Sequence, residues 1–378
     1  SRMSSAAALD RIVDQPRAKD LLVAAVQEDR LCHAYLFVGA PGSGMEDAAT
    51  ALAMCAVCPN GGDGSCDECI RVVHRTHPDV HWLVPGSVTG YLVDQVREII
   101  DGVSLAPARA DRKVYIMERA GLLRGAAANA LLKTIEEPPA DVIFILVARS
   151  EETVLPTIVS RCQVVPFQVV APGAALSEVM RSGASEREAR IALSVAGTPM
   201  RAVEFLASDS RRKVRRSVVR IMGELARDDS WDVLQSAREL LDGARVPLAD
   251  VRDAQEAALK QSSDFLTSAA LKQVEAANKR ELSARERSGM MEVLAAIDSV
   301  LRDVLLRCED VAEPIVNADA ADVVDRLAAA TNTQGALRAL EATNRAADDL
   351  EHNVSSQLTL EVMLLSIKEA LTCPPSFR

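Results

Sequence analysis

The stretch LFVGAPGSGMED, Leu36 to Asp47, decides how the first half of the chain is interpreted. An apolar run leads into a glycine-rich segment and then into a helical pattern, which is the order of a phosphate-binding loop. Read from Gly39, the segment matches G-x-x-x-x-G, but Met45 and Glu46 stand where that motif requires Lys and then Ser or Thr. The motif therefore keeps the glycines of a nucleotide site and lacks its charged and metal-binding groups.

The two replaced side chains remove the chemistry of such a loop. In a working loop the lysine neutralises the β and γ phosphates and the hydroxyl holds Mg²⁺. Met45 supplies neither charge nor donor, Glu46 adds negative charge, and each lost charge-assisted contact weakens binding by about 1.5 to 3 kcal/mol. We expect weak or no nucleotide binding at Gly39, Gly42 and Gly44, and no ATP hydrolysis by this chain. The alternative is a tight turn that uses glycine for its geometry alone.

Short β-rich runs alternate with helical patterns over the first 170 residues. Near-continuous apolar runs such as VIFILVA suit a parallel sheet covered on both faces, and strands separated by helices predict an α/β domain. The run KVYIM leads into Glu118 and Arg119, where ATPases of this layout place an acidic pair that holds Mg²⁺, so a second catalytic motif is damaged. We expect strands at 35–39, 80–85, 114–117, 142–148 and 163–167, and helices at 46–57, 92–103 and 125–137.

No convincing strand follows residue 170. Residues 175–206 are expected to form two or three short helices, with breaks at AGTP and ASDS, and the chain from Arg211 onward has helical spacing. No fixed-period repeat is evident, which favours a packed bundle over a solenoid. The sequence therefore predicts a nucleotide-binding-like α/β domain at 1–170, a small all-α domain at 171–207 and an all-α bundle at 208–378.

Composition limits the classes of function. The net charge of -11 and the pI of about 5.1 over 378 residues argue against a whole-surface nucleic-acid binder. The basic run RRKVRRSVVR, residues 211–220, either lines a DNA-facing channel or forms a solvated helix face, and we favour the solvated face. No apolar run approaches the roughly 20 residues that span a bilayer, and no signal-like segment is evident. We expect a cytoplasmic protein with no membrane contact.

Half of the eight cysteines crowd into one short segment: Cys55, Cys58, Cys66 and Cys69. The pattern C-x₂-C-x₇-C-x₂-C suits tetrahedral Zn²⁺ with no open position for chemistry, so the predicted site is structural. A pair of disulfides is the main alternative. Replacement of one sulfur by His74 or His77 is a second alternative.

Five motifs, taken in order, carry a resemblance to a known family: HAYLFVGAPGSG, the four clustered cysteines, THPDV, AAANALLKTIEEPP and LPTIVSRCQ. With them the sequence resembles the delta-prime family of bacterial DNA polymerase III clamp-loader subunits over roughly residues 8 to 205. The resemblance implies an AAA+ domain with an inserted zinc module at 55–69, then a helical lid and a C-terminal collar that holds subunits together. It also implies a subunit that hydrolyses no ATP itself.

The resemblance assigns roles to two arginines. Arg161 lies in Ser160-Arg161-Cys162, which matches a family motif whose arginine projects toward ATP on a neighbouring subunit, so an arginine finger acting in trans is implied. The other interpretation of Arg161 is a local cap or ion pair. Arg201, in GTPMR, is similar to a sensor arginine of the lid; it is expected either to face this subunit's own nucleotide site or to hold lid to core.

The partners implied by the resemblance are the ATPase motor subunits and a delta-type subunit of a hetero-oligomer. Through that complex, which serves a DNA-directed DNA polymerase, they include the sliding clamp and primer–template DNA. One rival function is an active ATPase motor subunit, which requires Lys and Thr at Met45 and Glu46. Another is a zinc-containing DNA-binding protein with a vestigial nucleotide domain, but residues 55–69 contain no Lys, Arg or aromatic side chain.

Two features depart from the family pattern. Family members usually carry one cysteine near the helix end and three closely spaced cysteines later, so two C-x₂-C pairs leave the geometry of the zinc loop open. After VIFILVA, the position of a small polar sensor residue in active ATPases is occupied by Ala148-Arg149-Ser150. The second departure again favours a site without hydrolysis.

Overall fold

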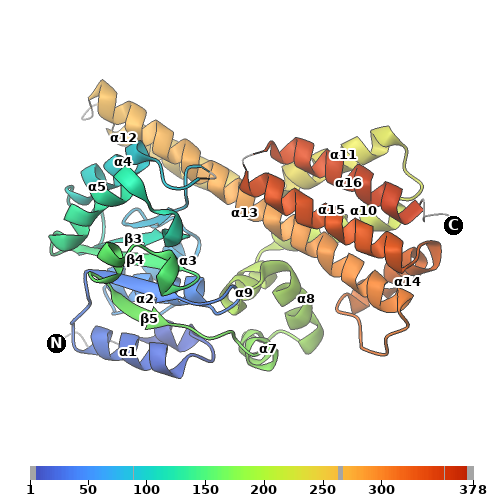
Figure 1. The fold of residues 1–378 in the computed structure, drawn as a ribbon, viewed down its shortest axis with the longest axis horizontal. Helices are drawn as coiled ribbons and strands as arrows, with labels where there is room; N and C mark the ends of the chain where they lie inside the picture. Colours follow the sequence, from blue (N-terminus) through green and yellow to red (C-terminus); the bar gives the residue numbers. More distant parts are fainter. Residues whose placement is uncertain (1–5, 88, 263–266, 353, 373–378) are drawn as a thin grey trace. The chain divides into compact units, whose positions relative to one another are not determined.

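The computed structural model describes residues 6–87, 89–262, 267–352 and 354–372 (Figure 1). The chain forms two compact units, one of residues 1–178 with 198–200 and one of residues 179–197 with 201–378. This division does not test a separate small domain at 171–207, and the three-domain division stays a prediction.

A five-stranded parallel sheet forms the centre of the first unit, in the order β2-β3-β4-β1-β5. The central strands are apolar on both faces, as expected of strands with helices above and below them, and every residue of β4 is buried. The predicted α/β fold and its five strands are therefore confirmed. Their bounds are β1 (Ala34–Val38), β2 (Val80–Leu83), β3 (Lys113–Met117), β4 (Val142–Ala148) and β5 (Gln163–Pro166).

Helices cover both faces of this sheet (Figure 1). Alternate strand residues contribute to two separate cores, because successive side chains of a strand point to opposite faces. One core joins the sheet to η1 (Ala7–Arg11), α1 (Pro16–Gln27), α2 (Met45–Val57) and α3 (Asp67–Val73). The other joins it to α4 (Val93–Val103), η2 (Ala120–Leu122), α5 (Gly125–Glu136) and α6 (Pro156–Val159), with η3 (Glu151–Thr153) preceding α6.

The strand order decides where the candidate site lies. β3, β4 and β1 are neighbours and run parallel, so their carboxyl ends meet at one edge of the sheet. The glycine-rich loop follows β1, Glu118 follows β3, and Arg149 follows β4. Open α/β sheets bind ligands at this edge, where the strand order reverses.

In the part of the second unit that the structure describes, all regular secondary structure is helical, which confirms the predicted all-α C-terminal region. The predicted breaks near residues 197 and 208 separate α8, α9 and α10. Among the described residues, none of the helices combines the length and the apolar character that crossing a membrane requires. Beginning with α7 and α9, which each straddle the two units, the helices are α7 (Pro172–Met180), α8 (Glu186–Ala196), α9 (Pro199–Ala207), α10 (Asp209–Glu224), α11 (Ser230–Arg245), α12 (Leu248–Ser262), α13 (Ser268–Cys308), η4 (Ala318–Ala320), α14 (Ala321–Ala330), α15 (Thr333–Glu351) and α16 (Ser356–Thr372).

The 41-residue helix α13 organises the second unit by packing against α8, α10, α11, α12, α14 and α15. Its buried side chains follow the helical spacing that the sequence predicts, from Val293 to Val304. Asp303 on α13 accepts hydrogen bonds from the N–H groups of Val316 (3.0 Å) and Asn317 (2.8 Å). This buried carboxylate fixes the loop between α13 and α14.

Candidate functional site

The glycine-rich loop keeps the backbone shape that its sequence predicts. Gly42 (φ 83°) and Gly44 (φ 78°) lie in the left-handed region that favours glycine, and Gly44 caps α2. A Cβ on Gly39 would lie 2.9 Å from the carbonyl oxygen of Phe167 and 2.7 Å from Ser43 Oγ. Each glycine therefore has a geometric reason in this turn, whether or not phosphate binds.

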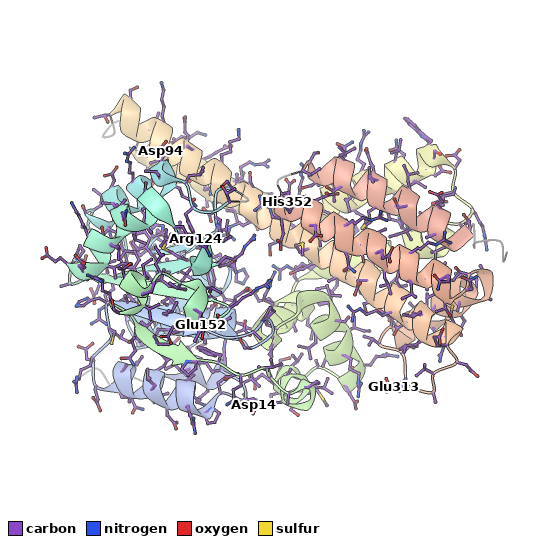
Figure 2. The ribbon with its side chains drawn as sticks, in the orientation of Figure 1. Asp14, Asp94, Arg124, Glu152, Glu313 and His352 are labelled. Atoms are coloured by element: carbon purple, nitrogen blue, oxygen red, sulfur yellow. The ribbon has the colours of Figure 1, made fainter. Side chains whose placement is uncertain are left out.

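Two residues before α1 hold the loop beside the end of β5. The buried Gln15 amide donates to the carbonyl of Ser43 (3.1 Å) and to that of Gln168, while its Oε1 accepts from the N–H of Gln168 (2.9 Å). The neighbouring Asp14, labelled in Figure 2, accepts from the N–H of Ala171 (3.3 Å). Sequence reasoning missed both residues because two of their three partners, Gln168 and Ala171, lie more than 150 residues away in the sequence.

The first side chains of α2, the helix that follows the loop, make structural contacts. Met45 packs against the core cluster that contains Phe167 and Met200. Asp47 is only 5% exposed, and its carboxylate accepts from Thr198 Oγ1 (2.8 Å) and from the N–H of Met200 (2.9 Å). Asp47 therefore caps the N-terminus of α9, where a negative charge is favoured. Sequence reasoning gave Asp47 no role.

The end of β3 is also occupied by protein contacts. A guanidinium nitrogen of Arg75 lies 3.6 Å from a carboxylate oxygen of Glu118, and the guanidinium stacks 3.9 Å from the Trp82 ring centroid. Arg119 follows in the left-handed conformation (φ 51°). The acidic group that would hold a metal ion in an ATPase thus has an arginine as counter-ion, and its neighbour has the wrong charge.

Three of the four clustered cysteines come together with a carboxylate. The ligand atoms of Cys58, Asp63, Cys66 and Cys69 all lie within 4.8 Å of one another. The sulfurs of Cys58 and Cys66 are 3.5 Å apart, close to the roughly 3.8 Å between sulfurs of a tetrahedral site with Zn–S of about 2.3 Å. Thiolates with a carboxylate form a donor set that suits Zn²⁺, so the residues fit a four-coordinate metal.

The loop between the two cysteine pairs prepares charged ligands. Burial raises the pKa of the Cys58 thiol, but N–H groups of Asp63, Gly62 and Asn60 donate to its sulfur and bring the pKa below its usual value. The N–H of Ser65, the Asn60 amide and the N–H of Cys66 hold the pKa of the Asp63 carboxyl well below its usual range. Both shifts favour the anionic form that binds a cation, whereas burial raises the pKa of the Cys66 and Cys69 thiols.

The remaining predicted ligands lie outside this group. Cys55 is buried on α2, and a Cβ on Gly62 would lie 2.5 Å from its sulfur, so the glycine loop covers it. Burial raises the pKa of the Cys55 thiol to about 12. The buried His77 instead accepts from the N–H of Asp79 (3.1 Å) and faces a Glu68 oxygen at 2.9 Å. Among the described residues, the seven cysteines are all free thiols.

Arg161 lies at the end of α6, partly exposed. Its guanidinium donates to the carbonyl of Thr157 (2.7 Å) and to Ser160 Oγ (3.2 Å), and it forms an ion pair with Glu136, the last residue of α5. The side chain keeps 34% of its surface exposed. The predicted local ion pair is therefore present, and the role of Arg161 in trans stays a prediction.

Arg201 has partners within the second unit. Its guanidinium donates to Ser288 Oγ (2.7 Å) and lies 3.8 Å from a carboxylate oxygen of Glu292, both on α13. These contacts anchor α9 to the long helix. The sensor-like role that the resemblance implies stays a prediction.

The basic run on α10 is largely neutralised by acidic partners. Arg211 lies near Glu204 and Glu292, Arg212 near Asp209, and Arg220 near Glu224 and Glu239. Arg215 is buried and donates to Asp319 and Asn317 (2.8 Å each). The run therefore serves packing and surface ion pairs in the described structure, in line with the favoured solvated face.

Comparison with protein families gives two matches. A family model described as "DNA polymerase III, delta subunit" matches residues 14–171, and one described as "DNA polymerase III, delta subunit, C terminal" matches residues 256–369. The first match covers the sheet, the loop and the cysteine cluster. The second covers most of the helical unit.

Two curated proteins and one solved structure are similar to this chain. The DNA polymerase III subunit delta' of Bacillus subtilis is 34% identical over 210 residues, 55% of this chain and 64% of that protein. The subunit delta' of Escherichia coli is 40% identical over 147 residues, 38% of this chain and 44% of that protein. A crystal structure of a DNA polymerase III gamma subunit-related protein from Thermotoga maritima aligns with 95% of this chain and 100% of its own, at 18% identity and a TM-score of 0.42.

The matched segments span less than two thirds of these curated relatives' own lengths. The first family-model match, residues 14–171, includes the glycine-rich loop, the cysteine cluster and Arg161. Over residues 14–171 and 256–369 the chain is similar to DNA polymerase III delta subunits, and the two curated relatives are subunits delta'.

Proposed function

We propose that this chain is a clamp-loader subunit that hydrolyses no ATP itself and supplies Arg161 to the ATP site of a neighbouring subunit. In this role it sits in a ring of related AAA+ subunits, with ATPase motor subunits and a delta-type subunit as partners. The helical second unit holds the ring together while the sliding clamp is placed on primer–template DNA. The single observation that carries the proposal is a nucleotide loop that keeps its glycine turn while Met45 packs on the core where a phosphate-binding lysine would stand.

Three local contacts support the absence of hydrolysis. Met45 packs into the core in place of a phosphate-binding lysine. Asp47 caps α9 through two hydrogen bonds. Glu118 has the Arg75 guanidinium beside it, where an ATPase would hold a divalent cation. The first contact replaces the cation on the phosphates, the second commits the start of α2 to structure, and the third places a cation where the metal would bind.

The position of Arg161 supports its role toward a neighbour. An arginine finger must be charged, partly exposed and held on a fixed element, because it stabilises charge that develops on the transferring phosphoryl group. Arg161 is 34% exposed and held by α6 and by the end of α5. Since this subunit's own loop lacks the groups for catalysis, the ATP that Arg161 serves belongs to another chain.

We further propose that the cysteine cluster holds a structural Zn²⁺. Cys58, Cys66 and Cys69 would supply thiolates and Asp63 a carboxylate oxygen, and four protein ligands leave no position for a reacting water. The bound ion would neutralise these anionic groups. It would also tie the segment between α2 and α3 to the core that contains these two helices. No catalytic step is assigned to it.

The test of the proposed function is reconstitution with subunits that carry an intact phosphate loop, followed by measurement of DNA-stimulated ATP hydrolysis. Arg161→Ala is expected to reduce turnover about 10³-fold at the one ATP site that Arg161 serves. The total hydrolysis rate of the complex therefore falls by the fraction that this site contributes. Arg97→Ala is the matched control, because Arg97 is also an exposed arginine in a surface ion pair of the first unit. Equal rates for the wild-type and Arg161→Ala complexes would overturn the proposal, as would ATP turnover by the purified chain alone.

A further inference from the structure

We infer that Glu136 is a positioning residue for Arg161: its carboxylate holds the guanidinium in the orientation that reaches a phosphate of ATP on the neighbouring subunit. This inference rests on the proposed function of Arg161. The two side chains come from elements 25 residues apart in sequence, the end of α5 and the end of α6, and they form an ion pair.

The contacts of the guanidinium define its orientation. One terminal nitrogen donates to the Thr157 carbonyl and to Ser160 Oγ, and the other pairs with Glu136. The first two acceptors, Thr157 on α6 and Ser160 in the turn after it, are local to Arg161, so they hold the group only to its own segment. Glu136 is the contact that ties the guanidinium to a second element. A guanidinium has five N–H donors, so three acceptors leave donors for a phosphate oxygen.

A buried core residue lies close in sequence to each partner. Ile135 precedes Glu136, Ile158 lies three residues before Arg161, and both isoleucines are buried in the same core against β4. This shared core restrains the backbone near both partners. Only the flexible ends of two long side chains remain to be ordered, and the ion pair orders them.

Because the Arg161–Glu136 pair is partly exposed, the geometric effect of Glu136 on the guanidinium can be distinguished from the effect of its negative charge. The Glu136 side chain is 42% exposed, so solvent and salt screen its charge from an incoming phosphate. The geometric restraint on the guanidinium is not screened in this way. Exposed pairs of this kind contribute little to folding stability, which makes the effect of Glu136 on catalysis separable from an effect on the fold.

The experiment uses Glu136→Gln, which removes the charge and keeps the shape. Glu137→Gln is the matched control, because it makes the same change of charge at the adjacent residue, outside the ion pair with Arg161. The measured quantity is the Arg161-dependent rate: the DNA-stimulated ATP hydrolysis of the reconstituted wild-type complex minus that of the Arg161→Ala complex. ATP is varied so that kcat and KM are obtained separately.

We expect Glu136→Gln to lower kcat of the Arg161-dependent rate about threefold to fivefold, the range that the loss of one exposed ion pair allows. KM for ATP and the melting temperature of the complex should stay at their wild-type values. Glu136→Asp should restore part of the rate, Glu137→Gln should match wild type, and Glu136→Gln should have no further effect when Arg161 is already Ala.

The outcomes separate the two proposals. If Arg161→Ala itself leaves hydrolysis unchanged, the proposed function fails. If Arg161→Ala lowers hydrolysis while Glu136→Gln matches or exceeds the wild-type rate, the positioning role is overturned and the proposed function stands. A further loss from Glu136→Gln in the Arg161→Ala background also overturns the positioning role, because Glu136 would then act independently of Arg161.

Discussion

At the scale of single residues, one carboxylate distinguishes the group of potential metal ligands in the structure from the predicted four cysteines. The sequence predicts ligation by Cys55, and the structure instead places Asp63 with the other three cysteines. The difference arises in the loop, where Gly61 (φ 72°) and Gly62 (φ 88°) take left-handed conformations that turn Asp63 back toward the sulfurs. Spacing along the chain identifies candidate ligands, but the path of a glycine-rich loop decides which of them meet.

The ligand set leads to a prediction about metal content. Cys58→Ala should abolish zinc retention after dialysis against a chelator, and Asp63→Asn should lower it, because each removes one of four ligands. Cys55→Ala should keep about one zinc per chain, because Cys55 lies outside the cluster. Zinc is measured by mass spectrometry, and the number of thiolates by the charge-transfer absorption of the Co²⁺-substituted protein. Loss of zinc in Cys55→Ala with full retention in Asp63→Asn would establish the four-cysteine set instead.

Arg161 also shows that local sequence identifies a residue without identifying its contacts. The motif SRC was sufficient to single out this arginine, but not its ion pair with Glu136. A surface pairing of this kind depends on how two helix ends are placed, and nothing in either local sequence records it. Asp47 and Gln15 were missed for the same reason, since their partners come from distant segments.

At the scale of elements, the sequence predicted the sheet closely. Each expected strand lies within two residues of its observed bounds, because strands buried on both faces appear as uninterrupted apolar runs. The helices expected at 46–57, 92–103 and 125–137 agree within one residue. No helix was expected at α1, which has 12 residues, or at α3, which has only seven and is the case that length explains. Short helices carry too few turns for a clear hydrophobic period.

The element formed by β1, the glycine-rich loop and α2 leads to a second prediction. Replacing Met45 by Lys and Glu46 by Thr should tighten ATP binding, because the lysine restores a positive charge at the phosphates. Hydrolysis should stay at background, because Glu118 remains paired with Arg75 and Arg119 remains where a second acidic residue is needed. Binding of a fluorescent ATP analogue and release of inorganic phosphate measure the two effects. Steady phosphate release by the double variant would show that the end of β3 is not what prevents catalysis.

At the scale of the whole molecule, the negative net charge indicates that this chain alone does not bind DNA tightly. The net charge is -11, and four of the six basic residues between Arg211 and Arg220 have acidic partners. Binding to DNA depends on cations that replace the counter-ions of the phosphates, and non-specific dissociation constants of about 10⁻⁴ to 10⁻⁶ M need several such contacts at physiological salt. Contact with primer–template DNA is therefore expected to come mainly from other subunits.

This argument gives the last prediction. The isolated chain should bind primed DNA more weakly than about 10⁻⁴ M at physiological salt, measured by fluorescence anisotropy. Lys213 and Arg216 are exposed basic residues of the run, and neither belongs to the ion pairs described above. A variant with Lys213→Ala and Arg216→Ala therefore tests whether this face of α10 touches DNA within the complex. We expect the reconstituted complex to keep its DNA affinity and the salt dependence of that affinity. A weaker affinity with a shallower salt dependence would place DNA on α10, because each lost phosphate contact reduces the number of counter-ions released on binding.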